Sequence, residues 1–167
     1  IGEEAMNAAL SAIEGKKTGD VVVPGILVTA DNVEEYLTDD QAKKKAVIGV
    51  VEGDTHDIGK NLVKIMMETA GFEMYDLGRD VPLDQFIEKA KEVDADLICM
   101  STLMTTTMGG MQTVIEKLKD QGIRDKFKVM VGGSPISKKF ADDIGAEGYS
   151  VNAVEAVKVA KELTGIA

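Results

Sequence analysis

The sequence has few aromatic side chains: 4% of its 167 residues are aromatic, and tryptophan is absent. Proteins that bind single-stranded nucleic acid stack the bases on aromatic rings, so this class is disfavoured. Basic residues are also in deficit, because 19 Lys and Arg stand against 29 Asp and Glu, for a formal net charge of −10. Affinity for a phosphate backbone comes mainly from cationic side chains. We therefore expect no nucleic-acid partner.

Cysteine is almost absent, and long hydrophobic runs are missing. Cys99 is the only cysteine, so no disulfide can form within the chain, which is typical of proteins in a reducing cytoplasm. It lies in the apolar run 97–100, where a buried and unreactive thiol is expected. No apolar run approaches the ~20 residues that a membrane-spanning helix needs. We therefore expect a cytoplasmic protein with no membrane partner.

Residues 1–45 have the pattern of helices and no strand. Apolar residues recur at helical spacing up to Gly15, which ends a first helix. Pro24 is expected in the first turn of a second helix that continues toward Leu37. Two helices of this length bury little surface alone, so we expect them to belong to a helical bundle or to pack on the following domain.

From Ala46 onward, strand and helix patterns alternate. Val47–Val51 is a β-branched run, as in a parallel strand covered on both faces. Further strands are expected near 73–76, 97–101, 128–131 and 148–149, and helices at 57–71, 83–93, 109–121, 137–144 and 153–163. This alternation predicts an α/β domain over residues 46–167 with a doubly wound, flavodoxin-like parallel sheet in the order 2-1-3-4-5. Ligands of such sheets bind beyond the carboxyl ends of the strands, near the switch between strands 1 and 3.

The loop after the first of these strands contains His56, the only histidine of the chain, two residues after Asp54. A lone histidine is more often structural or exposed than a metal ligand. An acidic side chain two residues before a histidine can, however, accept a hydrogen bond from one ring nitrogen. This contact fixes the tautomer and leaves the other nitrogen available to a metal. One histidine cannot hold zinc alone, and no cysteine pair is available. A metal here would have to arrive already chelated, as in a tetrapyrrole-like macrocycle that needs one protein donor.

Three short motifs follow three of the expected strands: Asp54-x-His56-x-x-Gly59, Ser101-x-Leu103 and Gly132-Gly133. They are separated by 41 residues (60–100) and by 28 residues (104–131). Motifs and spacing together resemble the signature of cobalamin-binding domains in methionine synthase, corrinoid methyl carriers and cobalamin-dependent mutases. The resemblance covers about residues 46–167. Taken singly, a threonine run or a glycine pair is equally typical of a turn.

The resemblance implies a role for each residue of these loops. His56 would be the lower axial ligand of the cobalt in place of the cofactor's own base, Asp54 would hydrogen-bond His56, and Thr107 would complete the relay. The displaced nucleotide tail would enter a pocket between the strands, with a floor near Tyr149 and Ala153. The residues implied to contact the cofactor are Gly53, Asp54, Thr55, His56, Asp57, Ile58, Gly59, Ser101, Leu103, Thr105, Thr107, Gly132, Gly133, Ser134, Tyr149 and Ala153.

The resemblance also implies a function, that of a corrinoid carrier with cobalamin, as methylcobalamin or a related corrinoid, for its cofactor. Such a carrier takes a methyl group from a substrate-specific methyltransferase and passes it to an acceptor methyltransferase, and a corrinoid reductive activator keeps it competent. Residues 20–33 resemble the end of the helical cap of such carriers, of which about the first half is not in the sequence. This partial cap, placed in residues 1–45, favours a carrier over the cobalamin-binding subunit of an adenosylcobalamin-dependent mutase.

Two other protein classes share the expected fold. A response-regulator receiver needs an Asp after the third strand and a Lys after the fourth, where this chain has Ser101 and Gly132. A flavodoxin-like electron carrier would hold a flavin phosphate in a Ser/Thr-rich first loop, for which Thr55 alone is weak support. No residue set for activating a methyl donor is evident, so we expect a subunit of a methyltransferase system and not a complete enzyme. The donor stays open among methylamines, methanol, methoxylated aromatics and betaines.

Overall fold

The structure is a computed structural model that describes residues 21–23, 26–28 and 43–166. The chain divides into two compact units, Ile1–Ala42 and Lys43–Ala167. In the first unit, β1 (Val21–Val23) pairs antiparallel with β2 (Ile26–Val28).

This hairpin corrects the expectation that residues 1–45 contain no strand and that a helix runs through residues 26–28. Val21–Val23 is a run of three valines, and β-branched side chains lose rotamer freedom in a helix and favour strands. The Pro-Gly dipeptide in the sequence between the two strands is a turn signal, which the helical interpretation overlooked. The first expected helix and the rest of the expected cap lie outside the described residues.

The second unit is built on a five-stranded parallel sheet in the order β4-β3-β5-β6-β7. Its strands are β3 (Lys45–Val51), β4 (Glu73–Val81), β5 (Leu97–Ser101), β6 (Lys128–Gly132) and β7 (Gly148–Ser150). Numbered within the sheet, this is the order 2-1-3-4-5, so the expected doubly wound, flavodoxin-like fold is confirmed. The central strand β3 is buried over six of its seven residues, as its apolar sequence predicts.

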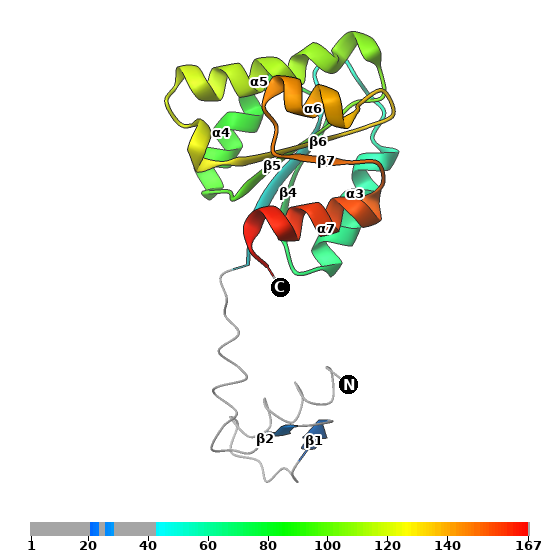
Figure 1. Ribbon diagram of the computed structural model, residues 1–167, viewed down its shortest axis with the longest axis vertical. Helices are drawn as coiled ribbons and strands as arrows, with labels where there is room; N and C mark the ends of the chain where they lie inside the picture. The colour runs from blue at the N-terminus through cyan, green and yellow to red at the C-terminus, as the bar shows by residue number, and fades with distance from the viewer. Residues whose placement is uncertain (1–20, 24–25, 29–42, 167) are drawn as a thin grey trace. The chain divides into compact units, whose positions relative to one another are not determined.

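Four helices join the strands, a fifth follows the last strand, and together they cover both faces of the sheet. They are α3 (Ile58–Thr69), α4 (Leu83–Val93), α5 (Met108–Asp120), α6 (Lys138–Ile144) and α7 (Ala153–Thr164), with short 3-10 turns η1 (Thr105–Thr107) and η2 (Arg124–Lys126). Figure 1 shows α3 and α7 on one face and α4, α5 and α6 on the other. Each face therefore closes over its own hydrophobic layer.

The two layers follow from the alternation of side chains along each strand. In β5, Leu97 and Cys99 face the α3–α7 layer, whereas Ile98 and Met100 face the α4–α5–α6 layer. These four side chains are each at most 3% exposed. Full burial of an aliphatic side chain of this size contributes about 1.5–3 kcal/mol, so the two layers hold the sheet rigidly under its loops.

The edge strand β4 differs from expectation in length. Residues 73–76 were expected as a short strand, but β4 continues to Val81 with two shifts of register against β3. Gly78 and Asp80 have positive φ angles of 87° and 52°, so the strand bulges there. An edge strand tolerates such bulges because only one side is paired, and residues that signal a turn can therefore sit inside it.

Candidate functional site

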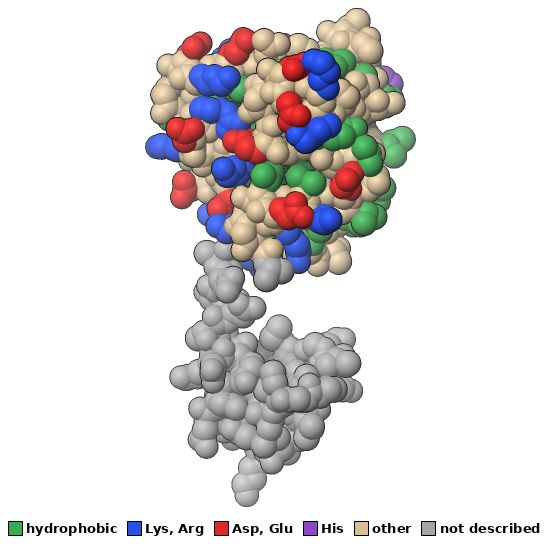
Figure 2. Space-filling model, in the orientation of Figure 1, with side chains coloured by type: hydrophobic (Ala, Val, Ile, Leu, Met, Phe, Trp, Pro, Cys, Tyr) green, Lys and Arg blue, Asp and Glu red, His purple; other side chains and the backbone are tan. Residues whose placement is uncertain are grey.

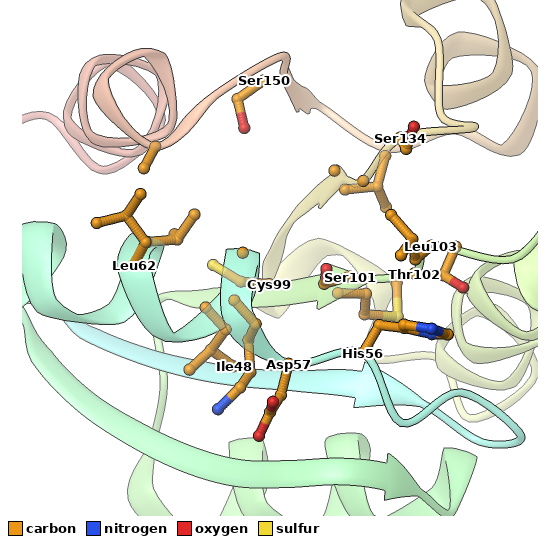
Figure 3. A pocket seen from close by; sticks show the side chains of 18 of the residues that line it. Ile48, His56, Asp57, Leu62, Cys99, Ser101, Thr102, Leu103, Ser134 and Ser150 are labelled. Carbon is orange, nitrogen blue, oxygen red and sulfur yellow. The ribbon is translucent and has the colours of Figure 1, made fainter.

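The loops after β3, β5 and β6 meet around one cavity of about 880 Å³ at the carboxyl edge of the sheet. This is the switch point of the fold, where β3 has β4 on one side and β5 on the other. Figure 3 shows His56 beside Thr102 and Leu103 at one end of the cavity and Leu62 at the other. Most residues expected to contact a cofactor line this cavity: Thr55, His56, Asp57, Ile58, Gly59, Ser101, Leu103, Gly132, Gly133, Ser134, Tyr149 and Ala153.

Four expected residues, Gly53, Asp54, Thr105 and Thr107, do not line the cavity. Twelve lining residues were missed by sequence reasoning: Ile48, Lys60, Leu62, Val63, Cys99, Met100, Thr102, Met130, Val131, Ser150, Val151 and Asn152. Strand alternation alone could have found some of them, because Cys99 and Met130 lie two residues before Ser101 and Gly132 and so share their face.

The His56 side chain is held by a fully buried carboxylate. Asp54 Oδ1 lies 2.6 Å from His56 Nδ1 and also accepts a hydrogen bond of 2.9 Å from the His56 backbone N–H. An ionised carboxylate can only accept, so Nδ1 carries the proton, and in the neutral ring the lone pair is then on Nε2. The imidazole is 52% exposed at the mouth of the cavity. Its Nε2 is therefore available to a ligand.

The other oxygen of Asp54 reveals a residue that sequence reasoning did not assign. Asp54 Oδ2 accepts hydrogen bonds from Thr102 Oγ1 at 2.7 Å and from the Leu103 backbone N–H at 2.6 Å. Thr107 makes no direct hydrogen bond to Asp54; its hydroxyl lies 2.5 Å from that of Thr102. Because the Thr102 hydroxyl donates to Asp54, it accepts from Thr107 in that contact. Thr107 thus reaches Asp54 only through Thr102.

These contacts keep Asp54 ionised. Burial by itself would raise the pKa of Asp54, but hydrogen bonds from the Thr102 hydroxyl, the His56 and Leu103 backbone N–H groups and the His56 ring outweigh it. The pKa is held well below its ordinary value. The negative charge under the imidazole is therefore permanent at neutral pH, which makes Nε2 a better electron donor.

Gly133 allows two loops to approach each other closely. It has a φ angle of 129°, and a Cβ atom placed there would lie 1.8 Å from the Thr102 carbonyl oxygen. The sequence suggested that glycine leaves room for a ligand. The structure gives a stronger reason, since the residue must lie against the backbone of the loop that carries Thr102.

Apolar side chains surround the mouth of the cavity. Ile58 is 86% exposed, and Leu62, Leu103 and Val151 are also exposed. Figure 2 shows hydrophobic side chains gathered on the side of the domain where α3 and the start of α7 lie, near the histidine. An exposed apolar rim around a cavity is typical of a binding site for a large, partly apolar ligand.

The described residues contain no group of three or more His, Cys, Asp or Glu side chains that could hold a metal ion. A metal at His56 must therefore bring its other ligands with it. A macrocyclic metal complex fits this requirement, because His56 Nε2 could supply one donor and the apolar rim could supply a surface for the ring. In the part of the chain that the structure describes, no helix has the length and apolarity to cross a bilayer.

Comparison with known families identifies this kind of ligand. The family described as the B12 binding domain matches residues 44–158. The chain belongs to this family. Its cofactor is a cobalamin-type corrinoid, as the resemblance in the sequence implied.

Relatives of this B12-binding domain include dimethylamine corrinoid protein 3 of Methanosarcina mazei, which is 50% identical over 155 residues, or 87% of this chain and 93% of that protein. The solved monomethylamine corrinoid protein of Methanosarcina barkeri has 38% identity and a TM-score of 0.69 over 80% of this chain and 66% of that one. The methanol:cobalamin methyltransferase complex MtaBC of the same species has 29% identity and a TM-score of 0.69 over 83% of this chain. This chain spans about half, 54%, of the MtaBC chain that it matches.

The B12-binding domain offers a direct test of the Thr102 contact. Thr102→Val removes the hydroxyl that joins Thr107 to Asp54 but keeps the shape of the side chain. We expect a loss of about 1–3 kcal/mol in the free energy of unfolding, because a charged acceptor is left with one donor fewer. We also expect a change in the ¹⁵N chemical shifts of the His56 ring in the protein without cofactor, because Asp54 can then rotate.

Thr105→Val is the matched control, since Thr105 is a threonine three residues after Thr102, in the 3-10 turn η1, and is exposed. It should leave both quantities unchanged. Equal effects of the two substitutions, or an unaltered His56 spectrum in Thr102→Val, would show that the Thr102 hydroxyl does not position the histidine.

Proposed function

We propose that this chain is the methyl-carrying corrinoid protein of a methylamine methyltransferase system, with dimethylamine as the methyl donor. One observation carries the proposal: His56 Nδ1 is bound at 2.6 Å by a fully buried carboxylate, and the ring stands at the mouth of the cavity, where none of the described residues hydrogen-bonds Nε2. The choice of donor is supported by relatives named dimethylamine corrinoid proteins, which are about half identical to this chain.

A corrinoid bound here would supply a cobalt centre that can accept a methyl group and release it again. His56 would hold that centre from below through Nε2, with the cofactor's own base displaced into the cavity. Asp54 would set the donor strength of the imidazole, because its charge and hydrogen bonds orient the ring and favour a partial positive charge on it. Thr102 and Thr107 would hold Asp54 in place by donating toward it.

The chain would depend on partners for the two transfers. One methyltransferase would bring the methylamine, a second would remove the methyl group, and a reductive activator would restore the reduced metal. The existence of a methyltransferase complex for a related carrier supports the first of these partners, since MtaBC is described as a methanol:cobalamin methyltransferase complex.

Labelled dimethylamine tests the proposed donor. The cofactor-loaded chain is reduced and mixed with a dimethylamine methyltransferase and isotopically labelled dimethylamine. We expect label on the carrier only when the methyltransferase is present, at least about tenfold faster than from labelled monomethylamine or methanol supplied with their own matching methyltransferases, because a tenfold preference for one partner corresponds to about 1.4 kcal/mol.

The control is a carrier loaded with cobinamide, which lacks the nucleotide tail, at the same cobalt content. Equal labelling from all three donors would reject dimethylamine as the specific donor. Failure to label the loaded carrier with any donor and its matching methyltransferase would reject the carrier function itself.

A further inference from the structure

The cavity wall formed by the sheet has two rows of side chains, fixed by strand register. In the row next to the mouth, Ser101 pairs with Gly132 and Gly132 pairs with Ser150. Two residues earlier on β5 and β6 lies the deeper row, in which Cys99 pairs with Ile48 on one side and with Met130 on the other. All six residues line the cavity. A ligand that enters from the mouth therefore passes the first row before it reaches the second.

The row next to the mouth presents hydroxyl groups that have no partner in the protein. Within the described part of the chain, neither Ser101 nor Ser150 makes a side-chain hydrogen bond, although Ser150 is only 8% exposed. Figure 3 shows both hydroxyl groups at the wall of the cavity. Gly132 lies between them, and a Cβ atom there would come within 3.3 Å of the Ser150 carbonyl oxygen. A hydroxyl that faces the cavity at this depth and makes no hydrogen bond to the described residues is free to bond a polar atom of a ligand.

The deeper row is apolar. Ile48, Cys99 and Met130 are each at most 3% exposed, and burial raises the pKa of the Cys99 thiol to about 12, so the thiol is neutral. A thiol is a weak donor and a thioether a weak acceptor. The ammonium of the lining residue Lys60 is bound at 2.6 Å by Asp76, which is not part of the cavity wall. Purely carbon surface is therefore the best match for this depth.

We propose that this cavity selects corrinoids by their lower base, and favours a benzimidazole over a purine. The inference rests on the proposed function, in which the base is displaced into the cavity. A benzimidazole has one free ring nitrogen on its five-membered ring, near the ribose, and an all-carbon six-membered ring beyond. This order, polar and then apolar, is the order of the two rows from the mouth inward.

A purine places polar atoms where the cavity has no partner for them. Adenine carries two nitrogens in its six-membered ring and an exocyclic amino group, and these would lie against Ile48, Cys99 and Met130. Polar groups buried without a hydrogen bond lose the water that they had in solution, and leaving even one such group without a partner weakens binding by roughly ten- to a hundredfold. Discrimination of that size decides which corrinoid the chain holds when both are present.

The test compares three corrinoids on the full chain without cofactor. Cobalamin with its dimethylbenzimidazole base, the corresponding corrinoid with adenine, and cobinamide are titrated, and dissociation constants are measured from visible spectra. We expect cobalamin to bind about ten- to a hundredfold more tightly than the adenine form, and cobinamide to bind more weakly than both.

Two variants locate the effect in the two rows. Ser150→Ala should weaken cobalamin binding about five- to tenfold and leave cobinamide unchanged, because only the tail meets this hydroxyl. Met130→Gln supplies hydrogen-bonding groups at the deeper row. It should lower the ratio of the dissociation constant of the adenine form to that of cobalamin at least threefold. Cys99→Ser makes a smaller change at the same depth and is used if Met130→Gln does not fold. Thr113→Ala, at a half-buried position of α5 that does not line the cavity, is the control and should change none of the constants.

The outcomes separate this inference from the proposed function. Equal binding of cobalamin and the adenine form, both tighter than cobinamide, would overturn the base preference while leaving the displaced base in place. Cobinamide binding as tight as that of cobalamin would show that the nucleotide tail does not bind in the cavity. That result would contradict both the base preference and the displaced base of the proposed function.

Discussion

Gly133→Ala is expected to abolish corrinoid loading and to lower the free energy of unfolding by about 3 kcal/mol or more. The added Cβ atom would lie 1.8 Å from the Thr102 carbonyl oxygen, and alanine is strained at a φ angle of 129°. Relief requires the loops after β5 and β6 to separate, which displaces Thr102 from Asp54. Urea unfolding measures the stability, and the ratio of cobalt to protein after reconstitution measures the loading.

Two other glycines separate the causes of this loss. Gly109→Ala, in α5, meets nothing within 4 Å and should keep full loading with a stability change within about 1 kcal/mol. Gly132→Ala comes within 3.3 Å of the Ser150 carbonyl oxygen, so the chain should still fold but load poorly, because the methyl group occupies the cavity. Wild-type stability and cobalt content in Gly133→Ala would contradict the close approach of the two loops.

His56→Ala is expected to remove the nitrogen ligand from the cobalt and to lower corrinoid affinity by a factor of about 10 to 100 or more. Loss of a residue that merely supports a metal ligand costs this much, so loss of the ligand should cost at least as much. Some corrinoid should remain bound through the apolar rim and the cavity. In the Co(II) form, the electron paramagnetic resonance spectrum should lose the hyperfine splitting that a coordinated nitrogen produces.

Thr55→Ala is the matched control, because Thr55 lies next to His56 in the same loop and also lines the cavity. Its spectrum should keep the nitrogen splitting. Retention of the splitting in His56→Ala would show that another group, such as the cofactor's own base, binds the cobalt. Asp54→Asn should keep the nitrogen splitting, and its corrinoid affinity should lie between those of Thr55→Ala and His56→Ala. The affinity falls because the His56 ring loses the negative charge beside it.

The order of strands and helices after residue 43 could be predicted from sequence because each element carries a local pattern. Val47–Val51 is β-branched at every position but Gly49, and the predicted bounds of α4 and β5 are those observed. The paired strands β1 and β2 were not predicted, because Pro24 was given more weight as a helix signal than the valine run was as a strand signal. The extension of β4 was missed because Gly78 and Asp80 read as turn residues, and only pairing with β3 keeps them in the strand.

The residues of the candidate site also divide into those that a local sequence pattern predicts and those that it does not. His56 and Asp54 are two residues apart, so their contact depends on one loop and was open to prediction. Thr102 is 48 residues from Asp54, and whether it or Thr107 reaches the carboxylate depends on how two loops approach. The deeper wall of the cavity was missed because Ile48, Cys99 and Met130 read as ordinary core residues, and their sequence gives no sign of a cavity above them.

By itself, then, the sequence determined the class of sheet, the edge at which a ligand binds, the family and the single histidine able to donate to a metal, since all of these depend on local patterns and on topology. The tertiary structure decided which hydroxyl holds Asp54, why Gly133 must be glycine and which side chains line the cavity. These depend on strand register and on backbone approach between segments far apart in the chain, and no local pattern encodes such distances.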